Sequence, residues 1–72
     1  MELIKEIEKN SREKLRVSLE DYKGKEYVDM RVFVKLGDSE EWIRTKKGLT
    51  LRKETLEELG EAIAEALKKF KE

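Results

Sequence analysis

The side chains of this chain that could do chemistry are basic residues interleaved with aromatic ones. Lysine and arginine neutralise phosphate groups, and flat aromatic rings stack on unpaired bases, each stack being worth about 1–3 kcal/mol. Single-stranded nucleic acid is held in this way, and its bases are tolerated rather than read. The residues of this kind are Tyr22, Lys23, Lys25, Arg31, Trp42, Arg44, Lys46 and Lys47. They predict a nucleic-acid interface, although each lysine alone is more simply a solvated charge and Trp42 fits a core anchor equally well.

Groups that support catalysis, or that hold a metal ion or a cofactor, are scarce. The chain has no Cys and no His, which removes thiolate ligands and the commonest acid–base group and metal ligand. Ser11, Ser18 and Ser39 have no plausible base, and the glycines match no phosphate-loop spacing. Carboxylates such as Glu40 and Glu41 are most simply solvated charges. We expect no catalytic residue, no metal site and no cofactor, and therefore no enzyme.

Charge is balanced in total but uneven along the chain. Charged residues make up 47% of the 72 residues, and 17 basic side chains cancel 17 acidic ones. Residues 11–53 hold twelve Lys and Arg against eight Asp and Glu, whereas residues 54–72 hold three against six and residues 1–10 two against three. A net charge of zero argues weakly against nucleic acid as a partner. The uneven distribution nevertheless predicts a basic sheet and an acidic helix.

The segment from Leu15 to Phe33 is expected to position the first basic and aromatic residues as a β-hairpin. Two runs alternate apolar with polar residues, which is typical of half-buried strands. Residues 22–25 form the predicted turn, where Gly24 supplies the positive φ that a two-residue hairpin connection requires. The alternating apolar positions are Leu15, Val17, Leu19, Val28, Met30 and Val32.

Shorter extended segments complete a predicted meander of antiparallel strands. Residues 2–9 carry apolar positions that suit a helix and a strand equally well, and the residues alone leave both open. The second hairpin strand is expected to run to Val34. Beyond it the sequence predicts a connection at 35–39, a short strand at 40–45, a basic turn at 46–48 and an extended piece at 49–51.

From about Lys53 the apolar period becomes that of an amphipathic helix. Gly60 lies within its apolar stripe, where glycine costs about 1 kcal/mol relative to alanine. It is either a tolerated weak point or the place where a neighbouring helix crosses closely. Because the chain has no second long helix, we predict a homodimer with a two-fold interface. The predicted interface residues are Leu56, Leu59, Gly60, Ile63, Leu67 and Phe70.

Residues 1–72 are expected to form one domain. A domain of this size buries only roughly 60% of the surface that its unfolded chain exposes, so its stability alone is marginal. With no disulfide possible, self-association is the remaining means of stabilisation. No segment resembles a signal peptide, and no apolar run approaches membrane-spanning length. We expect a soluble protein with no membrane partner, located in the cytoplasm and associated with the nucleoid if it is prokaryotic.

Three segments resemble the transcriptional coactivator positive cofactor 4 family, in particular its short prokaryotic members. They are RVSLEDYKGKEYVDMR at 16–31, EWIRTKKGLTL at 41–51 and the single C-terminal helix, in order and at near-matching spacing. The resemblance implies an α+β fold in which a four-stranded antiparallel curved sheet is followed by one long helix, with dimerisation through the helix. It also favours a strand around Ile4–Glu8.

In that family the curved sheets form grooves that bind single-stranded or melted DNA with little sequence preference. The resemblance carries this role to Tyr22, Lys23, Lys25, Arg31, Lys46 and Lys47. Three departures from the family pattern are visible. Val34 stands where relatives often have a stacking aromatic, Glu20 is acidic where a basic residue would help, and Ile43 with Arg44 replaces a more usual Lys-Pro. We therefore expect weaker binding than in a fully basic relative.

The leading hypothesis is a non-catalytic dimer that binds single-stranded DNA where duplexes are opened in transcription, replication or repair. Its affinity should fall with salt, because bound lysine and arginine release counterions from phosphates. One alternative is a protein–protein adaptor of the transcription machinery with the same fold. RNA binding is another, since backbone and stacking contacts suit either nucleic acid. The last alternative is a stable scaffold that binds no ligand.

Overall fold

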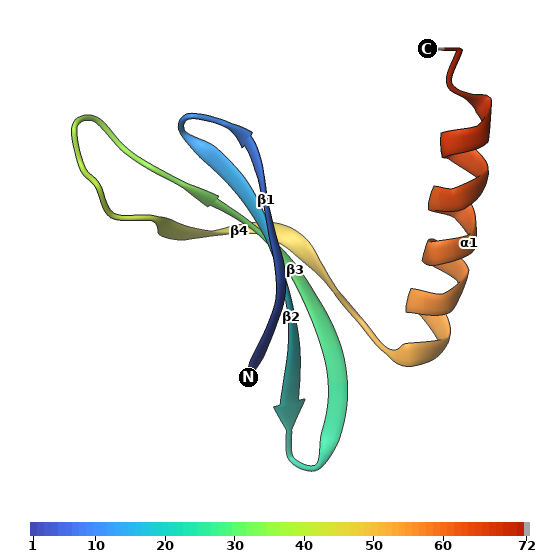
Figure 1. Ribbon diagram of the computed structural model, residues 1–72. Coiled ribbons are helices and arrows are strands. Elements are labelled where there is room, and N and C mark those ends of the chain that lie inside the picture. The colour runs from blue at the N-terminus through green and yellow to red at the C-terminus, as the bar shows by residue number, and fades with distance from the viewer. Residues whose placement is uncertain (72) are drawn as a thin grey trace.

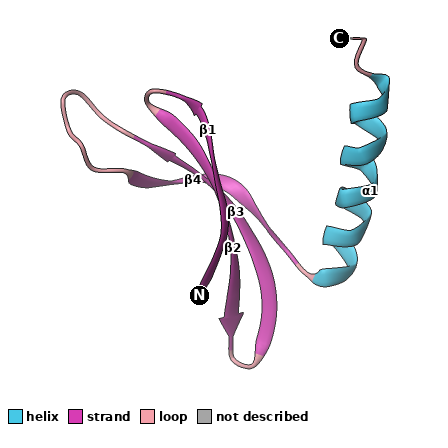
Figure 2. Cartoon of the chain, viewed as in Figure 1, coloured by secondary structure: helices cyan, strands magenta, loops and turns pink. Residues whose placement is uncertain are grey.

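The computed structural model describes residues 1–71, which form one four-stranded sheet and one helix (Figure 1). The strands are β1 (Glu2–Asn10), β2 (Glu13–Tyr22), β3 (Lys25–Val34) and β4 (Ile43–Leu51), and the helix is α1 (Lys53–Lys69). The strands lie in the order β1-β2-β3-β4, and each neighbouring pair is antiparallel. The predicted α+β fold, a curved antiparallel sheet followed by one C-terminal helix, is confirmed (Figure 2).

The N-terminal half of the chain forms the strands that were expected. Residues 2–10 are a strand, as the family resemblance implied. β2 and β3 pair over ten residues without interruption. In the turn between them both Lys23 (φ 53°) and Gly24 (φ 78°) have positive φ, which a type I′ turn requires at its two central residues. The Gly24 amide donates a hydrogen bond to Asp21 Oδ1 at 3.2 Å, which tightens the turn.

The fourth strand differs from the prediction. Residues 43–51 form one continuous strand, so the expected basic turn at 46–48 lies inside it, and residues 40–42 lie in the preceding loop. The pairing of β4 with β3 shifts along this stretch, because Gly48 is opposite Arg31 while Arg44 is opposite Phe33. Residues 45–47 therefore form a bulge. A bulge interrupts the apolar alternation of a strand, and this one carries two lysines and ends at Gly48, so its sequence resembled a turn.

Gly48 lets β4 approach β3 closely at one end of this bulge. A Cβ atom at this position would collide with the carbonyl oxygen of Met30. It would also lie 3.0 Å from both Cα and Cζ of Arg31. Because the obstructing atoms include backbone, they cannot move aside as the end of a flexible side chain could. A side chain at position 48 is therefore incompatible with the observed spacing of the two strands.

The pleat of the sheet separates two chemically different faces, since cross-strand partners share a face and successive residues alternate. We call them the apolar face and the polar face. The apolar face carries Ile7, Leu15, Val17, Leu19, Val28, Met30, Val32, Leu49 and Leu51. The polar face carries Glu6, Lys14, Arg16, Ser18, Glu20, Tyr22, Lys25, Tyr27, Asp29, Arg31, Phe33, Arg44 and Thr50.

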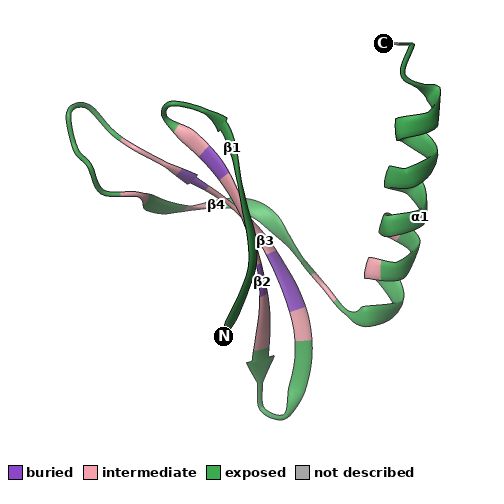
Figure 3. Ribbon diagram, viewed as in Figure 1, coloured by how far each residue is buried: buried purple, intermediate pink, exposed green. Residues whose placement is uncertain are grey.

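Only the first turns of α1 pack against the sheet. Leu56 and Leu59 are partly buried, but no residue of the helix is fully buried (Figure 3). Further along the predicted stripe, Ile63, Leu67 and Phe70 are 50%, 66% and 70% exposed. Phe70 follows the end of the helix in an extended conformation, although it was expected within the helical stripe. No helix in residues 1–71 has the length and apolar character needed to span a membrane.

The molecule is flat and open. Its extents are 43 × 39 × 17 Å, and its radius of gyration is 14.3 Å. A compact chain of this length has a radius of gyration of about 11 Å. Val28 and Phe33 are the hydrophobic side chains that count as buried within the described residues. A single chain therefore leaves most of its apolar face and helix stripe uncovered.

The close approach of β4 to β3 at Gly48 leads to a prediction about the stability of the fold. We expect Gly48→Ala to lower the free energy of unfolding by about 1–3 kcal/mol, because the added methyl group must push β4 away from β3. Urea denaturation at fixed protein concentration measures the change. Gly24→Ala is the matched control, since its Cβ would meet nothing within 4 Å and only its positive φ opposes the substitution. A Gly48→Ala protein as stable as the parent would contradict the prediction.

Candidate nucleic-acid interface

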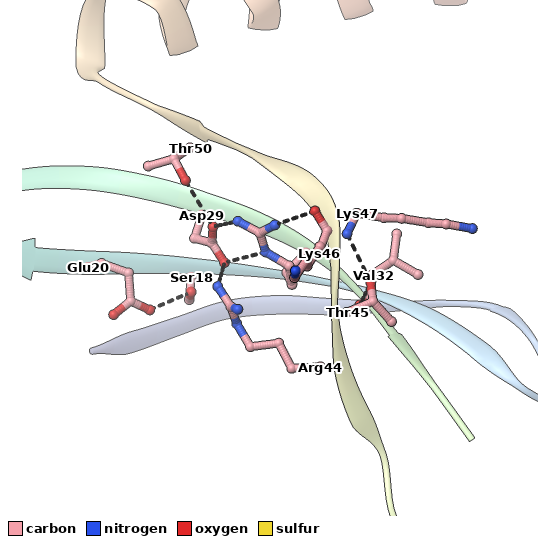
Figure 4. A network of polar contacts seen from close by, with 10 residues as sticks. Ser18, Glu20, Asp29, Val32, Arg44, Thr45, Lys46, Lys47 and Thr50 are labelled. Atoms are coloured by element: carbon pink, nitrogen blue, oxygen red, sulfur yellow. Dashed lines mark hydrogen bonds and ion pairs between the residues drawn. The ribbon is translucent and has the colours of Figure 1, made fainter. Parts of the chain in front are cut away.

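An ion pair between two residues of β3 lies at the centre of the polar face (Figure 4). Arg31 donates from Nη2 to Oδ1 of Asp29 at 2.6 Å and from Nε to Oδ2 at 3.4 Å. The two side chains are only 12% and 13% exposed, so water competes weakly for these charge-assisted hydrogen bonds. The Thr50 hydroxyl donates to Asp29 at 3.2 Å, and Arg44 Nη2 lies 3.8 Å from its other oxygen. Asp29 thus joins β3 to β4.

The same guanidinium holds the bulge of β4. Arg31 Nη1 donates to the carbonyl oxygen of Lys46 at 3.0 Å. The Thr45 hydroxyl donates to the carbonyl oxygen of Val32 at 2.7 Å and accepts from the Lys47 amide at 3.2 Å. These bonds fix the backbone from which the exposed side chains of Lys46 and Lys47 extend. Arg31, predicted as a contact to nucleic acid, therefore also positions two other predicted contacts.

Electrostatics keeps this pair ionised. The hydrogen bond from Arg31 is the largest of the effects that hold the pKa of Asp29 below its ordinary value of 3.8, although partial burial opposes it. The same bond raises the pKa of Arg31 above its ordinary value, again against desolvation. At neutral pH both groups are charged, and the pair stabilises the folded chain.

The four lysines predicted as phosphate contacts lie at two places. Lys23 and Lys25 flank Gly24 in the turn between β2 and β3, and Lys46 and Lys47 lie in the bulge of β4. All four are exposed and form no ion pair within residues 1–71. Several other basic side chains of the polar face are paired with carboxylates. The predicted phosphate contacts are therefore among the cations that remain available to a ligand.

The two predicted aromatic contacts differ in accessibility. Tyr22 is 60% exposed at the end of β2, with Lys23 Nζ 5.3 Å from its ring centroid. Trp42 is partly buried in the loop before β4. Lys14 Nζ and Lys35 Nζ lie 4.5 Å and 4.9 Å from the centroid of its ring, as in cation–π contacts. The ring of Tyr22 is exposed, with a lysine over it, whereas the ring of Trp42 anchors its loop to the sheet.

Sequence reasoning missed a second polar cluster around Glu6. Its carboxylate accepts hydrogen bonds from Lys14 Nζ at 3.0 Å and Arg16 Nε at 2.9 Å, and these bonds lower the pKa of Glu6. Arg16 also lies over the ring of Phe33, with Cζ 4.1 Å from the centroid. Only the pairing of β1 with β2 brings Glu6 opposite Arg16. That pairing could not be read from residues that fit a helix equally well.

Two groups of available residues therefore lie on either side of the ion-paired centre, one at the turn between β2 and β3 and one in the bulge of β4. We call Tyr22, Lys23 and Lys25 the turn group, and Lys46 and Lys47 the bulge group. Lys25 and Arg31, the β3 residue that holds the bulge, are six positions apart, or about 20 Å at the rise of a strand. The structure brings Arg44 to this centre as well, because it contacts Asp29. Trp42 belongs to neither group, because its ring lies against Lys14 and Lys35.

Comparison with known proteins gives one family and one solved relative. The family model described as Transcriptional Coactivator p15 (PC4) matches residues 9–62. A PC4 homologue from Burkholderia pseudomallei has the same fold in two crystal forms. The tetragonal form is 26% identical, with a TM-score of 0.78 over 90% of this chain and 94% of that chain. The orthorhombic form is 25% identical, with a TM-score of 0.82 over 96% of this chain and 92% of that chain. No curated protein sequence matches this chain.

The ion pair at the centre of the polar face predicts a pH dependence. We expect Asp29→Asn to cost about 1–3 kcal/mol at pH 7, because Arg31 then keeps its charge without a carboxylate partner. Since the pKa of Asp29 is lowered from 3.8 in the folded state, its contribution is complete above about pH 4 and is lost as the pH falls through the folded value. Urea midpoints at pH 7, 4.5 and 2.5 measure this.

The stability difference between the parent and Asp29→Asn should be equal at the two higher pH values and smaller at the lowest. Asp38→Asn, a change at an exposed loop residue, serves as the control and should show little difference at any pH. A difference that persists undiminished at pH 2.5 would mean that the charge of Asp29 is not what stabilises the fold.

Proposed function

The chain belongs to the transcriptional coactivator p15 (PC4) family, and from this premise we propose that it is a non-catalytic homodimer that binds single-stranded DNA. Family membership indicates nucleic-acid binding and a coactivator-like role. The proposal places the strand across the polar face, between the turn group and the bulge group. The protein would act where duplexes are melted in transcription, replication or repair. The observation that carries this function is the set of four exposed lysines that form no ion pair within residues 1–71, two of them next to the exposed ring of Tyr22.

Two kinds of contact account for the proposed binding. The lysines of the two groups neutralise phosphates, so affinity should fall with salt by about 0.7 logarithmic units per decade for each phosphate contact on a single strand. Tyr22 stacks on an unpaired base. Bases in a duplex are already stacked on one another and cannot use this ring. Preference for single strands therefore comes from Tyr22, and the strength of binding comes mainly from the lysines.

The proposed homodimer rests on the surface that a single chain leaves uncovered. α1 contacts the sheet only near its start, and its apolar stripe continues into exposed Ile63 and Leu67. Alanine at Gly60 would meet nothing within 4 Å in one chain. The missing side chain therefore has no purpose within the chain, but it would permit a second helix to cross closely. An identical helix from a second copy, related by a two-fold axis, would cover both stripes at once.

A protein–protein adaptor with the same fold is the second candidate function. The observation that favours it is the neutralised centre of the polar face, where Asp29 and Glu6 are paired with basic side chains. An adaptor would keep its partner after charge reversal at Lys46 and Lys47, whereas binding of nucleic acid would not survive that change.

The binding proposal is tested with a labelled oligo-dT of about 20 nucleotides and the matching duplex. We expect fluorescence anisotropy to report tighter binding of the single strand, weakened by salt. Tyr22→Ala should reduce affinity for the single strand by about 5- to 150-fold, the equivalent of one stack. Lys46→Ala with Lys47→Ala should lower the salt dependence by about 1.4 units, because two phosphate contacts are lost.

The control for the double substitution is Lys68→Ala with Lys71→Ala, which removes the same charge from the far end of the chain. It should leave the salt dependence nearly unchanged. If Tyr22→Ala has no effect while the bulge substitutions do, the surface is merely cationic and stacking is the wrong account. Absence of binding to the single strand at low salt would contradict the proposed function.

The homodimer makes a separate prediction. Light scattering at micromolar concentration should give twice the chain mass of 8.5 kDa. Leu67→Glu should give a monomer, while Glu61→Gln on the opposite side of the helix should not. Gly60→Ala should weaken dimerisation, even though alanine favours an isolated helix by about 1 kcal/mol. A monomeric mass for the parent protein would rule out the dimer.

A further inference from the structure

A hollow in the polar face lies between the turn group and the bulge group. Its volume is about 240 Å³, and it is lined by Glu20, Tyr27, Asp29, Arg44 and Thr50. The strand register explains how these residues meet. Glu20 of β2 is opposite Tyr27 of β3, and Asp29 of β3 is opposite Thr50 of β4. None of the lysines proposed to contact phosphates lines this hollow, so it is available to the bases of a strand that crosses the face.

Glu20 is the carboxylate of the hollow that forms no ion pair within residues 1–71. Its Oε2 accepts a hydrogen bond from the Ser18 hydroxyl at 2.7 Å. Ser18 is only 4% exposed, so this bond fixes the orientation of the carboxylate. Asp29, by contrast, is fully engaged by Arg31 and its neighbours on β4. Glu20 therefore retains acceptor capacity in the hollow.

A free carboxylate repels the phosphates of a bound polyanion. A hydrogen-bond donor on the ligand that reaches this carboxylate would offset the repulsion. Cytosine and adenine carry such a donor in their exocyclic amino groups, whereas thymine has a carbonyl oxygen at the equivalent position. Arg44 complements this arrangement, because its guanidinium has donors only and its side chain is 60% exposed. An acceptor and a donor on opposite sides of one hollow match the amino group and the adjoining ring acceptor of cytosine.

We propose that this hollow is a nucleobase site that selects amino-bearing bases, cytosine foremost, over thymine. Glu20 accepts a hydrogen bond from the exocyclic amino group, and Arg44 donates to the neighbouring acceptors of the same base. This inference rests on the proposed binding of single-stranded DNA and adds a base preference to it. The contact is partly exposed to water, so we expect the preference at the low end of the range for side chain–base pairs, about 5- to 20-fold in affinity.

The test compares oligo-dC with oligo-dT of about 12 nucleotides, at a pH slightly above neutral that keeps cytosine unprotonated. The parent protein should bind oligo-dC about 5- to 20-fold more tightly. Glu20→Gln should reduce this ratio to near one and should raise the affinity for oligo-dT, because a repulsive charge is removed from the path of the strand. Circular dichroism checks that the substituted protein is folded.

The matched control is Glu26→Gln, which removes the same charge on β3 one residue before Tyr27, on the other face of the sheet. It should leave the ratio of the two affinities unchanged. If Glu20→Gln strengthens binding of both oligonucleotides equally, Glu20 is only a repulsive charge and the base site is wrong. Equal affinities of the parent for the two oligonucleotides would overturn the preference alone, whereas binding of neither would overturn the proposed function with it.

Discussion

The ion pair between Asp29 and Arg31 is the interaction on which the polar face depends. One guanidinium bonds to a carboxylate of its own strand and to the carbonyl of Lys46 on the next strand. Removing Asp29 would leave the largely buried charge of Arg31 without a carboxylate partner, which costs more than the net stabilisation that an exposed pair provides. The centre of this face is therefore ordered by charge, and the bulge of β4 takes its position from that order.

The two faces of the sheet obtain their stability from different sources. On the polar face, hydrogen bonds and ion pairs are completed within one chain, so Asp29 and Lys14 can be buried at low cost. On the apolar face and along α1, large side chains stay exposed, and burial of such surface is the main source of folding free energy. The chain therefore completes its polar face by itself and leaves its apolar face uncovered, a surface that the proposed dimer would bury.

The sequence predicted those elements whose pattern is local. The hairpin has strict alternation and a glycine at a positive φ, and the helix has a clear apolar period. The choice between helix and strand was left open for β1, where every residue is exposed and no buried face imposes a clear alternation. The bulge made residues 46–48 resemble a turn. The resemblance to the PC4 family, now confirmed, supplied the missing strand. The sequence could not show that Lys14 and Lys35 lie against Trp42, because strand pairing far along the chain brings them there.

Net charge is a poor guide to what this surface can bind. The chain has 17 basic and 17 acidic side chains, but a ligand meets only the charges that the protein has not already paired. Glu6 is satisfied by Lys14 and Arg16, and Asp29 by arginines of β3 and β4, so the acids of the polar face are largely neutralised inside the fold. The lysines of the turn and bulge groups form no ion pair with any residue that the structure describes. A neutral chain can thus present a locally basic surface, because the register of its strands pairs Glu6 and Asp29 with basic side chains before any ligand arrives.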